Sequence, residues 1–495
     1  MTEFELKFQV PAAQRADVAR AVRRGRSRQM RLRAAYFDTD DGRLAAHGIA
    51  LRLRLEGDRW VQTAKARGPS LLERHEHNVD RPSPAAEPPQ PDLSLHEGTP
   101  VGKLISRALG KRRPPALVPV YATEVVRTTR EIREGSTMVE LAFDEGQIVA
   151  GSSAIDLCEL EFELKEGDAW VVLELARGWM LRHLLWLDTV SKAERGERLG
   201  KGLETGPARK AEPPALQPSM AGAAMLHAVV SACLAQILPN ASEVAGGRGQ
   251  AEHVHQLRVG LRRLRTALRE LAGFGAGVDP AWEPVLSAAF RALGEHRDRD
   301  HLVKAVQPQL AAAGGPAIDW DAGRKPPADP QETAQAAELQ GVLLDLIRFT
   351  LAPLPASTRE ARGADRKALE DRLRKLHKQV KQDGKQFAAL EPEQRHRLRK
   401  RGKRLRYLAE FVAPLYGGHA SVAYLAALEP AQDALGEYND LAVAQAAARA
   451  VAAHDPHAWF AVGWLAARQE AGIGACRKAL AKVGDAEPFW KSHER

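Results

Sequence analysis

Short runs of alternating apolar and polar residues fill the first 203 positions of the chain, and such alternation is typical of half-buried β-strands. We predict strands over residues 2–10, 49–56, 59–66, 72–79, 124–133, 137–143, 158–165 and 170–175. Helices are predicted at about residues 12–24, 101–109 and 178–187, and the proline-rich residues 82–91 are expected to form a surface loop. These antiparallel strands, about eight in number, fit either a barrel or a strongly curved sheet.

The rest of the chain has a different pattern. Ala-, Leu- and Arg-rich stretches with helical periodicity predict an almost entirely helical region. A proline-rich stretch over residues 204–218, with Pro207, Pro213 and Pro214, is predicted to be a linker between the two patterns. We therefore expect a multidomain α+β protein with a β domain over residues 1–203 and an all-α domain over residues 219–495.

The helical region contains an internal repeat. The residues His255, Arg258, Arg262, Arg263 and Arg265 have the same spacing as His396, Arg399, Lys403, Arg404 and Arg406. A Leu-Gly-Glu triplet also recurs in register, at residues 293–295 and 435–437. Two repeated helical bundles are therefore expected, joined through the Gly- and Pro-rich residues 314–330.

Positive charge is concentrated in one part of the chain. The whole chain has a net charge of +9, whereas residues 366–406 alone contain sixteen Lys or Arg and five Asp or Glu, so an anionic partner is expected. The three cysteines are too widely spaced to suggest a disulfide framework or a zinc cluster. The N-terminus lacks a signal pattern and no apolar run approaches the ~18 residues of a spanning helix, so we expect a cytoplasmic protein without a membrane partner.

The basic residues of each repeat share one helix face. At about 100° per residue, His255, Arg258, Arg262 and Arg265 fall opposite the leucines of the same helix, and the second copy has the same arrangement. A solvated face usually interleaves acids with bases, but these two stripes are nearly free of acids and favour a polyanion. Nucleic acid and inorganic polyphosphate both meet this requirement. Aromatic stacking platforms are scarce, at 5% of the chain, which makes nucleic acid the unlikely ligand of the two.

The spaced pattern H-x-x-R-V-x-x-R-R-x-R, its partner H-x-x-R-K-x-x-K-R-x-R-Y-x-x-E and the two Leu-Gly-Glu triplets resemble the CHAD domain over about residues 219–495. The resemblance implies that the basic surface binds inorganic polyphosphate. The residues that would carry this binding are His255, Arg258, Arg262, Arg265, Arg374, Lys378, Lys381, His396, Arg399, Lys403 and Arg406.

Charged residues share one face of the first predicted strand. Glu3, Glu5 and Lys7 lie on one side and the apolar residues at positions 4, 6 and 8 on the other, and residues 159–165 repeat this order. An open sheet with a wet polar face, on which charges pair across strands, is one explanation. The other is a barrel with an enclosed charged interior, where a metal-bound phosphate chain would compensate charges of both signs.

The complete set of strand motifs resembles the CYTH fold of the triphosphate tunnel metalloenzymes over about residues 1–203. The matching pieces, in order, are EFELKF, YFDTDD, LRLR, TAK, ERHEHNV, TEVVR, VELAFD, CELEFELKEG and SKAERG. This resemblance favours the barrel over the open sheet, and it implies an antiparallel eight-stranded β-barrel, with helices, whose tunnel is the active site.

The same resemblance implies roles for individual residues. A divalent metal, Mg²⁺ or Mn²⁺, would be held by Glu3, Glu5, Glu161 and Glu163. Triphosphate would be bound by Lys7, Arg52, Arg54, Lys65, Arg127 and Lys192. The implied catalytic residues are Glu5, Lys7, Lys65, Glu76, Glu140 and Asp144.

The combination of both resemblances favours inorganic tripolyphosphate over nucleotide or thiamine triphosphates, because both parts of the chain would then act on one class of polymer. We expect a divalent-metal-dependent inorganic triphosphatase that hydrolyses tripolyphosphate to pyrophosphate and phosphate, in the cytoplasm and at polyphosphate granules. The alternative is a non-catalytic, granule-associated binding or scaffold protein whose tunnel only binds polyphosphate.

Overall fold

The computed structural model describes residues 2–68, 73–82, 84, 88–110, 116–275, 277–354 and 358–491. The chain forms two compact units. The first consists of Met1–Arg209, Leu238–His253 and Ala334–Leu351, and the second of Lys210–Ile237, Val254–Thr333 and Ala352–Arg495. The first unit therefore includes two segments from beyond the proline-rich stretch, and the domain boundaries at residues 203 and 219 remain predictions.

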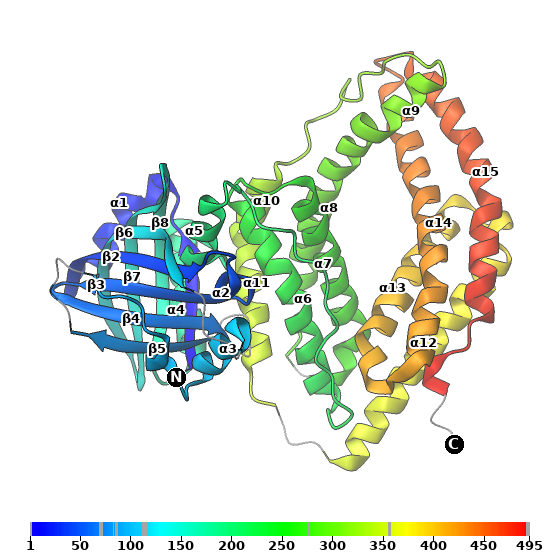
Figure 1. Cartoon of the computed structure of the whole chain (residues 1–495). Helices are drawn as coiled ribbons and strands as arrows, with labels where there is room; N and C mark the ends of the chain where they lie inside the picture. Colours follow the sequence, from blue (N-terminus) through cyan, green and yellow to red (C-terminus); the bar gives the residue numbers. More distant parts are fainter. Residues whose placement is uncertain are drawn as a thin grey trace. The chain divides into compact units, whose positions relative to one another are not determined.

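Eight strands of the first unit form a closed antiparallel barrel, drawn from blue to cyan in Figure 1. The strands follow the order β5-β4-β3-β2-β6-β7-β8-β1, and β1 closes the ring by pairing with β5. A ninth, short strand, β9, pairs with β1 outside the ring. The bounds are β1 (Thr2–Gln9), β2 (Ser27–Thr39), β3 (Ile49–Glu56), β4 (Arg59–Arg67), β5 (Glu73–Arg81), β6 (Leu117–Glu134), β7 (Thr137–Ala150), β8 (Ser153–Glu166) and β9 (Trp186–Leu187). The predicted eight-stranded barrel is confirmed.

The apolar sides of the strands face outward, toward helices. The ring of Phe8 on β1 meets Phe162 on β8, and Phe162 in turn meets Trp179 of α4 (Ala169–His183), with ring centres 5.7 and 6.2 Å apart. On another side of the barrel, Leu51 of β3 packs in one cluster with Ile105 of α3 (Pro100–Leu109). Since helices cover the apolar sides, the interior of the barrel is left to polar groups. The other short helices here are α1 (Arg15–Val22), α2 (Arg43–Ala46) and α5 (Lys192–Gly200).

The predicted strand at residues 170–175 is wrong, because these residues are the first half of α4. Asp168 caps this helix by accepting a hydrogen bond from the backbone N–H of Trp170, at 2.9 Å. The predicted helix at residues 178–187 is correct only up to residue 183, where α4 ends, because Leu184 adopts a left-handed φ of 52° and Trp186–Leu187 form β9. Both periods fit the apolar run Trp-Val-Val-Leu-Glu-Leu, and packing of the helix on β1 and β8 selects the helical one.

Two strands were not predicted, the short β9, which falls in the predicted helix, and the long β2. In β2 the buried Leu32, Ala34 and Tyr36 alternate with more exposed residues such as Arg31 and Arg33. The alternation is therefore present, but the strand begins with a polar, arginine-rich half that hides it. The predicted strand at residues 72–79 corresponds to β5 from residue 73 onward, and residue 72 lies outside the described residues. The predicted loop at 82–91 is described only at residues 82, 84 and 88–91.

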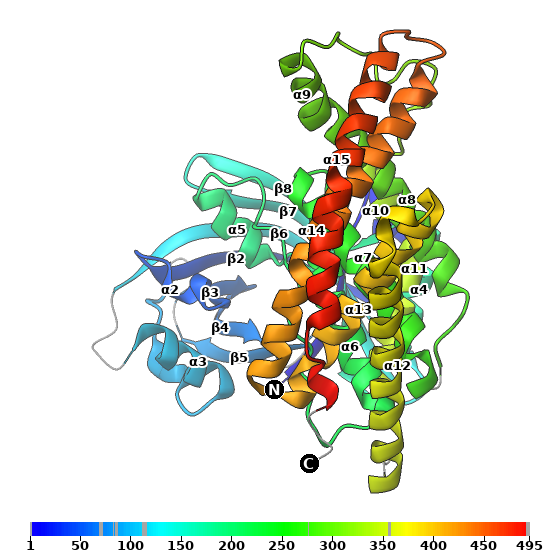
Figure 2. The same ribbon diagram turned by 90° about the vertical axis from the view of Figure 1, so that its right-hand side faces the viewer.

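The helical half of the chain confirms the all-α prediction. Helices α7 (Ala251–Leu271) and α13 (Pro392–Tyr416) carry the two copies of the basic motif. The helices α8 (Trp282–His301) and α14 (Gly418–Val451) follow them and carry the two Leu-Gly-Glu triplets. Helix α15 (Ala458–Asp485) packs along α14, and α12 (Arg359–Lys385) packs on α13 and α15 (Figure 2). The remaining helices are α6 (Gly222–Ala245), α9 (Gln307–Ala312), α10 (Pro330–Gln335) and α11 (Ala337–Leu351).

Helix α6 corrects the statement that no apolar run approaches the length of a membrane-spanning helix. It has 24 residues, and its most apolar 18-residue window has a mean hydropathy of 1.6. Of that window, 61% is buried inside the structure, as in the core helix of a helical bundle. Length and composition alone, in one largely buried helix, are weak support for a membrane span.

Candidate functional site

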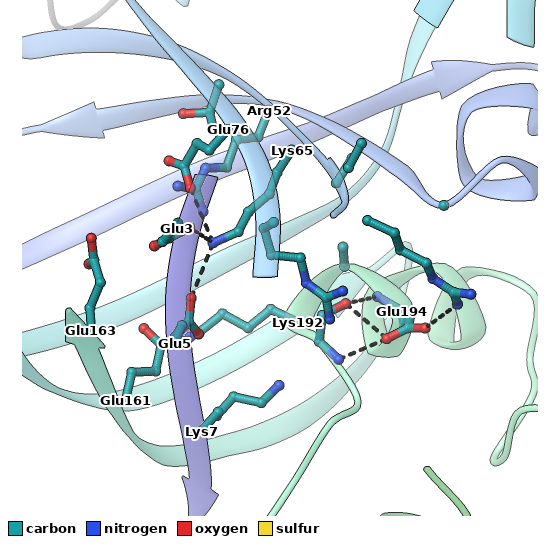
Figure 3. Close-up of a pocket in the computed structure, with 18 of the residues that line it drawn as sticks. Glu3, Glu5, Lys7, Arg52, Lys65, Glu76, Glu161, Glu163, Lys192 and Glu194 are labelled. Carbon is teal, nitrogen blue, oxygen red and sulfur yellow. Dashed lines mark hydrogen bonds and ion pairs between the residues drawn. The ribbon is translucent and has the colours of Figure 1, made fainter. Parts of the chain in front are cut away.

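The barrel encloses a cavity of about 840 Å³ that is lined by charges of both signs (Figure 3). Its carboxylates are those of Glu3, Glu5, Glu76, Glu140, Glu161, Glu163, Asp188, Glu194 and Glu197. Its Lys and Arg side chains are those of Lys7, Arg52, Arg54, Lys65, Arg67, Arg74, Arg127, Lys165 and Lys192. With nine acidic and nine basic side chains in one cavity, the charges can compensate one another and also bind a ligand that carries both metal and phosphate.

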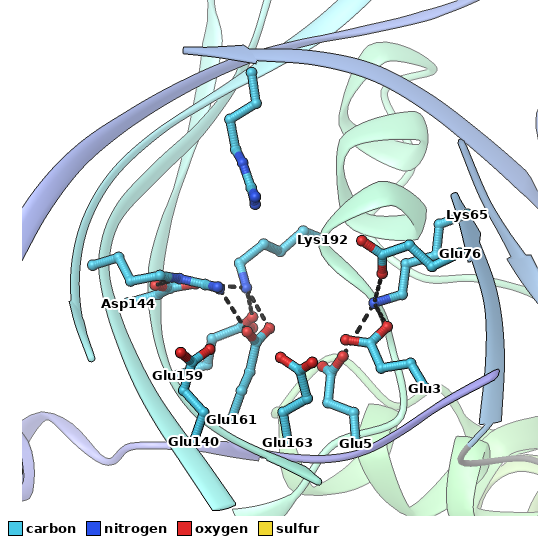
Figure 4. Close-up of polar contacts among 12 residues, drawn as sticks. Glu3, Glu5, Lys65, Glu76, Glu140, Asp144, Glu159, Glu161, Glu163 and Lys192 are labelled. Carbon is cyan, nitrogen blue, oxygen red and sulfur yellow. Dashed lines mark hydrogen bonds and ion pairs between the residues drawn. The ribbon is translucent and has the colours of Figure 1, made fainter. Parts of the chain in front are cut away.

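Strand register places the carboxylates of β1, β7 and β8 side by side. Glu5 lies opposite Glu163 across the β1–β8 pair, and Glu163 lies opposite Glu140 across the β8–β7 pair. Lys7 lies opposite Glu161 in the same way. Glu5 and Glu163 point into the interior between a lysine cluster on either side (Figure 4). The charged row of the first strand is therefore one part of a continuous acidic wall.

The first of these clusters surrounds Lys65 on β4. Its Nζ lies 2.6 Å from Glu3, 3.1 Å from Glu76 and 3.2 Å from Glu5. Burial, only partly offset by Lys65, raises the pKa of Glu3 to about 9, so this carboxyl is protonated at neutral pH. Burial opposes ionisation of Glu76 as well, but Lys65, a hydrogen bond with Glu3 and the charge of Arg52 outweigh it and hold the pKa of Glu76 low.

The second cluster surrounds Lys192, the first residue of α5. Its Nζ lies 2.6 Å from Glu161 and 2.8 Å from Asp144, and it also pairs with Glu159. Arg127 Nη2 reaches the same Asp144 and Glu161, at 2.6 Å each. Burial opposes ionisation of these two carboxyls, but Arg127 and Lys192 outweigh it and lower the pKa of both. Lys192 and Arg127 thus hold their carboxylates ionised in a buried site.

The other predicted barrel residues differ in how they are engaged. Lys7 donates a hydrogen bond to the backbone carbonyl of Val190. Arg54 pairs with Glu56 on its own strand, while burial and the charge of Arg52 lower the pKa of Arg54 to about 10. Asp144 is fully buried beneath Lys192 and does not line the cavity itself. The fold therefore brings all the residues predicted for the barrel into one cavity or its immediate wall.

The prediction missed charged residues that the fold adds to this site. Glu159 stands two positions before Glu161 and shares its strand face, so alternation alone could have included it. Lys165 continues the same face and lies 2.7 Å from Glu163. Glu194 faces the cavity from α5, where it forms a capping box with Ser191, and its spacing from that serine was the available signal.

A separate cationic cluster, defined by Arg258, Arg262, Arg399 and Lys403, lies where α7 meets α13. Arg262 Nε donates a hydrogen bond of 2.8 Å to Tyr407 Oη on α13, so the two predicted stripes come together. Burial, together with repulsion from Arg262 and Arg399, lowers the pKa of Lys403 to about 6. Such mutual repulsion shows that these cations are crowded, as expected of a polyanion site.

The remaining predicted residues of the helical region lie outside this crowded cluster. Arg265 pairs with Glu283 at 2.6 Å, and Arg406 pairs with Glu410. On α12, Arg374 pairs with Asp371 and Lys381 donates to the carbonyl of Gly484, while Lys378 is exposed. His255 is half-buried on α7, and His396 is exposed on α13 with Asn439 3.4 Å away. Acidic partners therefore already compensate Arg265, Arg374 and Arg406.

The fold and the site together define a class of protein: an antiparallel barrel whose cavity is lined by charged side chains of both signs, joined to a helical region with a cationic cluster. Residues 1–196 match the family model of the CYTH domain, and residues 228–449 match that of the CHAD domain. The chain therefore contains a CYTH domain followed by a CHAD domain.

Individual relatives carry related names. The chain is 30% identical over 169 residues to an inorganic triphosphatase of Haemophilus influenzae, over 33% of this chain and 45% of that protein. It thus spans less than half the length of this curated relative. The crystal structure of a CHAD domain from Ricinus communis has 28% identity, a TM-score of 0.43, and coverage of 56% of this chain and 96% of that one. A putative adenylyl cyclase from Hippeastrum, described as having a dominant triphosphatase activity, has 18% identity, a TM-score of 0.30, and coverage of 41% and 96%.

Proposed function

We propose that this protein is a divalent-metal-dependent inorganic triphosphatase, which hydrolyses tripolyphosphate to pyrophosphate and phosphate, and that its CHAD domain binds inorganic polyphosphate. The observation that carries the first part is the barrel cavity, in which an acidic wall adjoins buried Lys and Arg side chains. The relative named as an inorganic triphosphatase supports the same reaction. The CHAD-matched helices support a preference for inorganic phosphate chains over nucleotides.

The acidic wall fits a hard divalent cation. Glu5, Glu161 and Glu163 offer carboxylate oxygens from two neighbouring strands, and oxygen ligands are those that Mg²⁺ and Mn²⁺ prefer. In the structure, Lys65, Lys192 and Lys165 supply the positive charge that these carboxylates need. A bound metal ion would supply further charge neutralisation to phosphate oxygens. Glu3, with its raised pKa, would join the metal ligands on losing its proton.

The chain's own cations would do the remaining electrostatic work. Lys65, Lys192 and Arg127 approach the cavity from different strands and from α5, so each can address a different phosphate group of one short chain. Hydrolysis needs in-line attack of water on a terminal phosphorus, with the P–O bond to the pyrophosphate leaving group broken. Fixed positive groups stabilise the charge that develops on both sides of this bond.

Phosphate release from tripolyphosphate, with Mg²⁺ or Mn²⁺ added, tests the proposal. We expect activity in the native protein and a loss of about a hundredfold or more in Glu5→Gln and Lys65→Ala. Arg59→Ala is the matched control, because Arg59 is exposed on β4 and pairs with Asp80 away from the cavity. A native protein that releases no phosphate with either metal but still binds polyphosphate would support the non-catalytic scaffold instead. A screen with ATP, thiamine triphosphate and long-chain polyphosphate then defines the substrate.

The polyphosphate-binding part of the proposal rests on the cationic cluster of α7 and α13. Arg262→Ala and Arg399→Ala should each weaken binding of long-chain polyphosphate, whereas Arg265→Ala should change it less, because Glu283 lies 2.6 Å from Arg265 and already compensates it. Equal effects of all three substitutions would contradict a site at this cluster. A cytoplasmic location at polyphosphate granules is part of the same proposal, and a fluorescently tagged chain tests it.

A further inference from the structure

The segment that leads into Lys192 is an edge strand with two differently bonded sides. β9 lies on the outer edge of β1, with Leu187 opposite Phe8. The backbone N–H of Asp188 donates to the carbonyl of Lys7 at 2.8 Å, and the N–H of Val190 donates to the side chain of Asp188 at 2.7 Å. The N–H group of Asp188 therefore bonds the segment to β1, and the N–H group of Val190 bonds within the segment.

The odd-numbered residues bond in the opposite direction, to side chains from beyond the proline-rich stretch. The N–H of Leu187 donates to Gln340 Oε1 of α11, and the N–H of Thr189 donates to Ser242 Oγ of α6, each at 2.9 Å. In an extended chain, successive N–H groups point to opposite sides, so these two face away from β1. Two side chains thus complete an edge that no further strand covers among the residues that the structure describes.

Gln340 and Ser242 are both buried side chains. Their exposed fractions are 1% and 0%. Gln340 Nε2 donates to the carbonyl of Ala334 at 2.7 Å, which leaves its oxygen to accept from Leu187. Ser242 Oγ donates to the carbonyl of Leu238 at 2.8 Å, so its lone pairs remain for Thr189. Each acceptor is therefore oriented by a second hydrogen bond, Ser242 within α6 and Gln340 of α11 to a carbonyl of α10.

The same two helices hold the neighbouring elements of the first unit. Glu243, next to Ser242, is almost fully buried and pairs with Arg198 of α5, the helix that begins at Lys192. Helix α11 is tied to α4 by Arg177 and Asp345, at 2.9 Å, and by Glu174 and Arg348, at 2.7 Å. Leu187 and Thr189 before Lys192 and Arg198 after it therefore all bond to residues of the segments 238–253 and 334–351.

We infer that Gln340 and Ser242 are positioning residues for the barrel reaction. They hold residues 187–191 so that Lys192 reaches Asp144, Glu159 and Glu161. Both lie within the stretch that matches the CHAD domain model, so part of the CHAD-matched sequence serves the cavity of the CYTH domain. The expected effect on kcat rests on the proposed triphosphatase function, whereas the anchoring of residues 187–191 does not.

The experiment uses the full chain with Ser242→Ala, Gln340→Leu and the two combined. We expect kcat for tripolyphosphate to fall about tenfold in the double variant, because Lys192 loses its fixed position. Asn240→Ala is the matched control. It lies on the same helix turn as Ser242, is equally buried, and hydrogen-bonds the backbone of Arg209 rather than the segment before Lys192. Its kcat should remain within about twofold of the native value.

A merely structural role is separated from a positioning role by a double-mutant cycle with Lys192→Met. If Gln340 and Ser242 act through Lys192, their substitution in the Lys192→Met background should cause little further loss of kcat. A general loss of stability would instead multiply the two effects. Independent, multiplicative losses in this cycle, or an equal loss in Asn240→Ala, would overturn the inference.

Amide hydrogen exchange, read by mass spectrometry, tests the anchoring without any activity. Peptides that cover residues 186–192 should exchange at least about tenfold faster in the double variant than in the native chain, with Asn240→Ala unchanged there. Unchanged exchange would overturn the anchoring. A native protein without triphosphatase activity would refute the proposed function, and the exchange result would then decide the structural inference by itself.

Discussion

At the scale of single residues, the barrel interior is governed by lysines that each serve several carboxylates. Lys65 contacts three glutamates, one of which is protonated at neutral pH, and Lys192 contacts three carboxylates as well. The carboxylates of Asp144, Glu159 and Glu161 lie within 4.8 Å of one another around that ammonium group. Removal of one such lysine leaves several buried negative charges without compensation, which is costly.

For Lys192 we predict different outcomes for two substitutions. Lys192→Met should lower kcat/KM for tripolyphosphate by about 10²–10³, because it removes both a phosphate contact and the counter-charge of three carboxylates. Lys192→Arg keeps the charge and should retain more activity than the methionine variant. Steady-state kinetics measure the difference, and equal activities would show that the charge at this position is unimportant.

We predict that Lys403 makes the proposed polyphosphate binding dependent on pH. Its pKa of about 6 reflects burial and repulsion by Arg262, Arg399 and Arg258, with Asp440 as the opposing negative group. The side chain is therefore mostly neutral at pH 8 and gains its positive charge as the pH falls through about 6. Affinity for long-chain polyphosphate should rise about tenfold over that interval, the worth of one charged hydrogen bond.

The control for this prediction is Lys403→Arg, which stays charged over the whole interval. Its binding should show a shallower dependence on pH, and His396, whose pKa is lowered by partial burial, is one group that can contribute to the slope that remains. Titration of binding at constant ionic strength measures both proteins. Identical slopes would contradict the assignment to Lys403.

At the scale of elements, α7 and α13 are joined by reciprocal ion pairs of the two repeats. Arg263 of α7 pairs with Glu410 of α13, and Arg404 of α13 pairs with Glu270 of α7 at 2.6 Å. Arg372 of α12 approaches the same Glu270 at 3.7 Å. Since Glu270 is only 1% exposed, this carboxylate connects three helices from inside the bundle.

We predict that Glu270→Ala lowers the free energy of unfolding by about 3 kcal/mol, because it leaves two arginines without their shared buried partner. Glu283→Ala removes the exposed partner of Arg265 and should cost less than about 1 kcal/mol. Calorimetric unfolding of the full chain compares the two variants. Similar losses would show that burial of Glu270 adds nothing to its interaction.

Secondary structure itself was predictable to different degrees in the two halves. Helices were predicted wherever a long amphipathic stretch fitted only the helical period of 3.6 residues. The short apolar runs of the barrel region fitted both a strand and a helix. Residues 170–175 are helical because α4 packs on the outside of β1 and β8. β2 escaped prediction because arginines dominate its first half.

At the scale of the whole molecule, the proposed metal dependence and the proposed polyphosphate binding would belong to different sites. The acidic wall of the barrel would need a divalent ion, whereas the α7–α13 cluster offers cations of its own. Removal of metal with EDTA should therefore abolish phosphate release from tripolyphosphate and leave polyphosphate binding largely intact. Added Mg²⁺ or Mn²⁺ should restore release. Phosphate release that persists in EDTA would contradict a metal-dependent reaction.

The sequence by itself determined which faces of the strands are charged, because side chains alternate along any strand, and it determined the spacing of the two basic motifs. Those local rules suffice for Glu3 and Glu5 to share one strand face and for Glu161 and Glu163 to share another, and the pairing of β1 with β8 then joins the two faces into one surface. Only the tertiary structure decided that this surface is enclosed, since closure depends on the pairing of β1 with β5. It likewise decided the contacts of Leu187 with Gln340 and of Thr189 with Ser242, because residues so far apart in sequence meet only through folding.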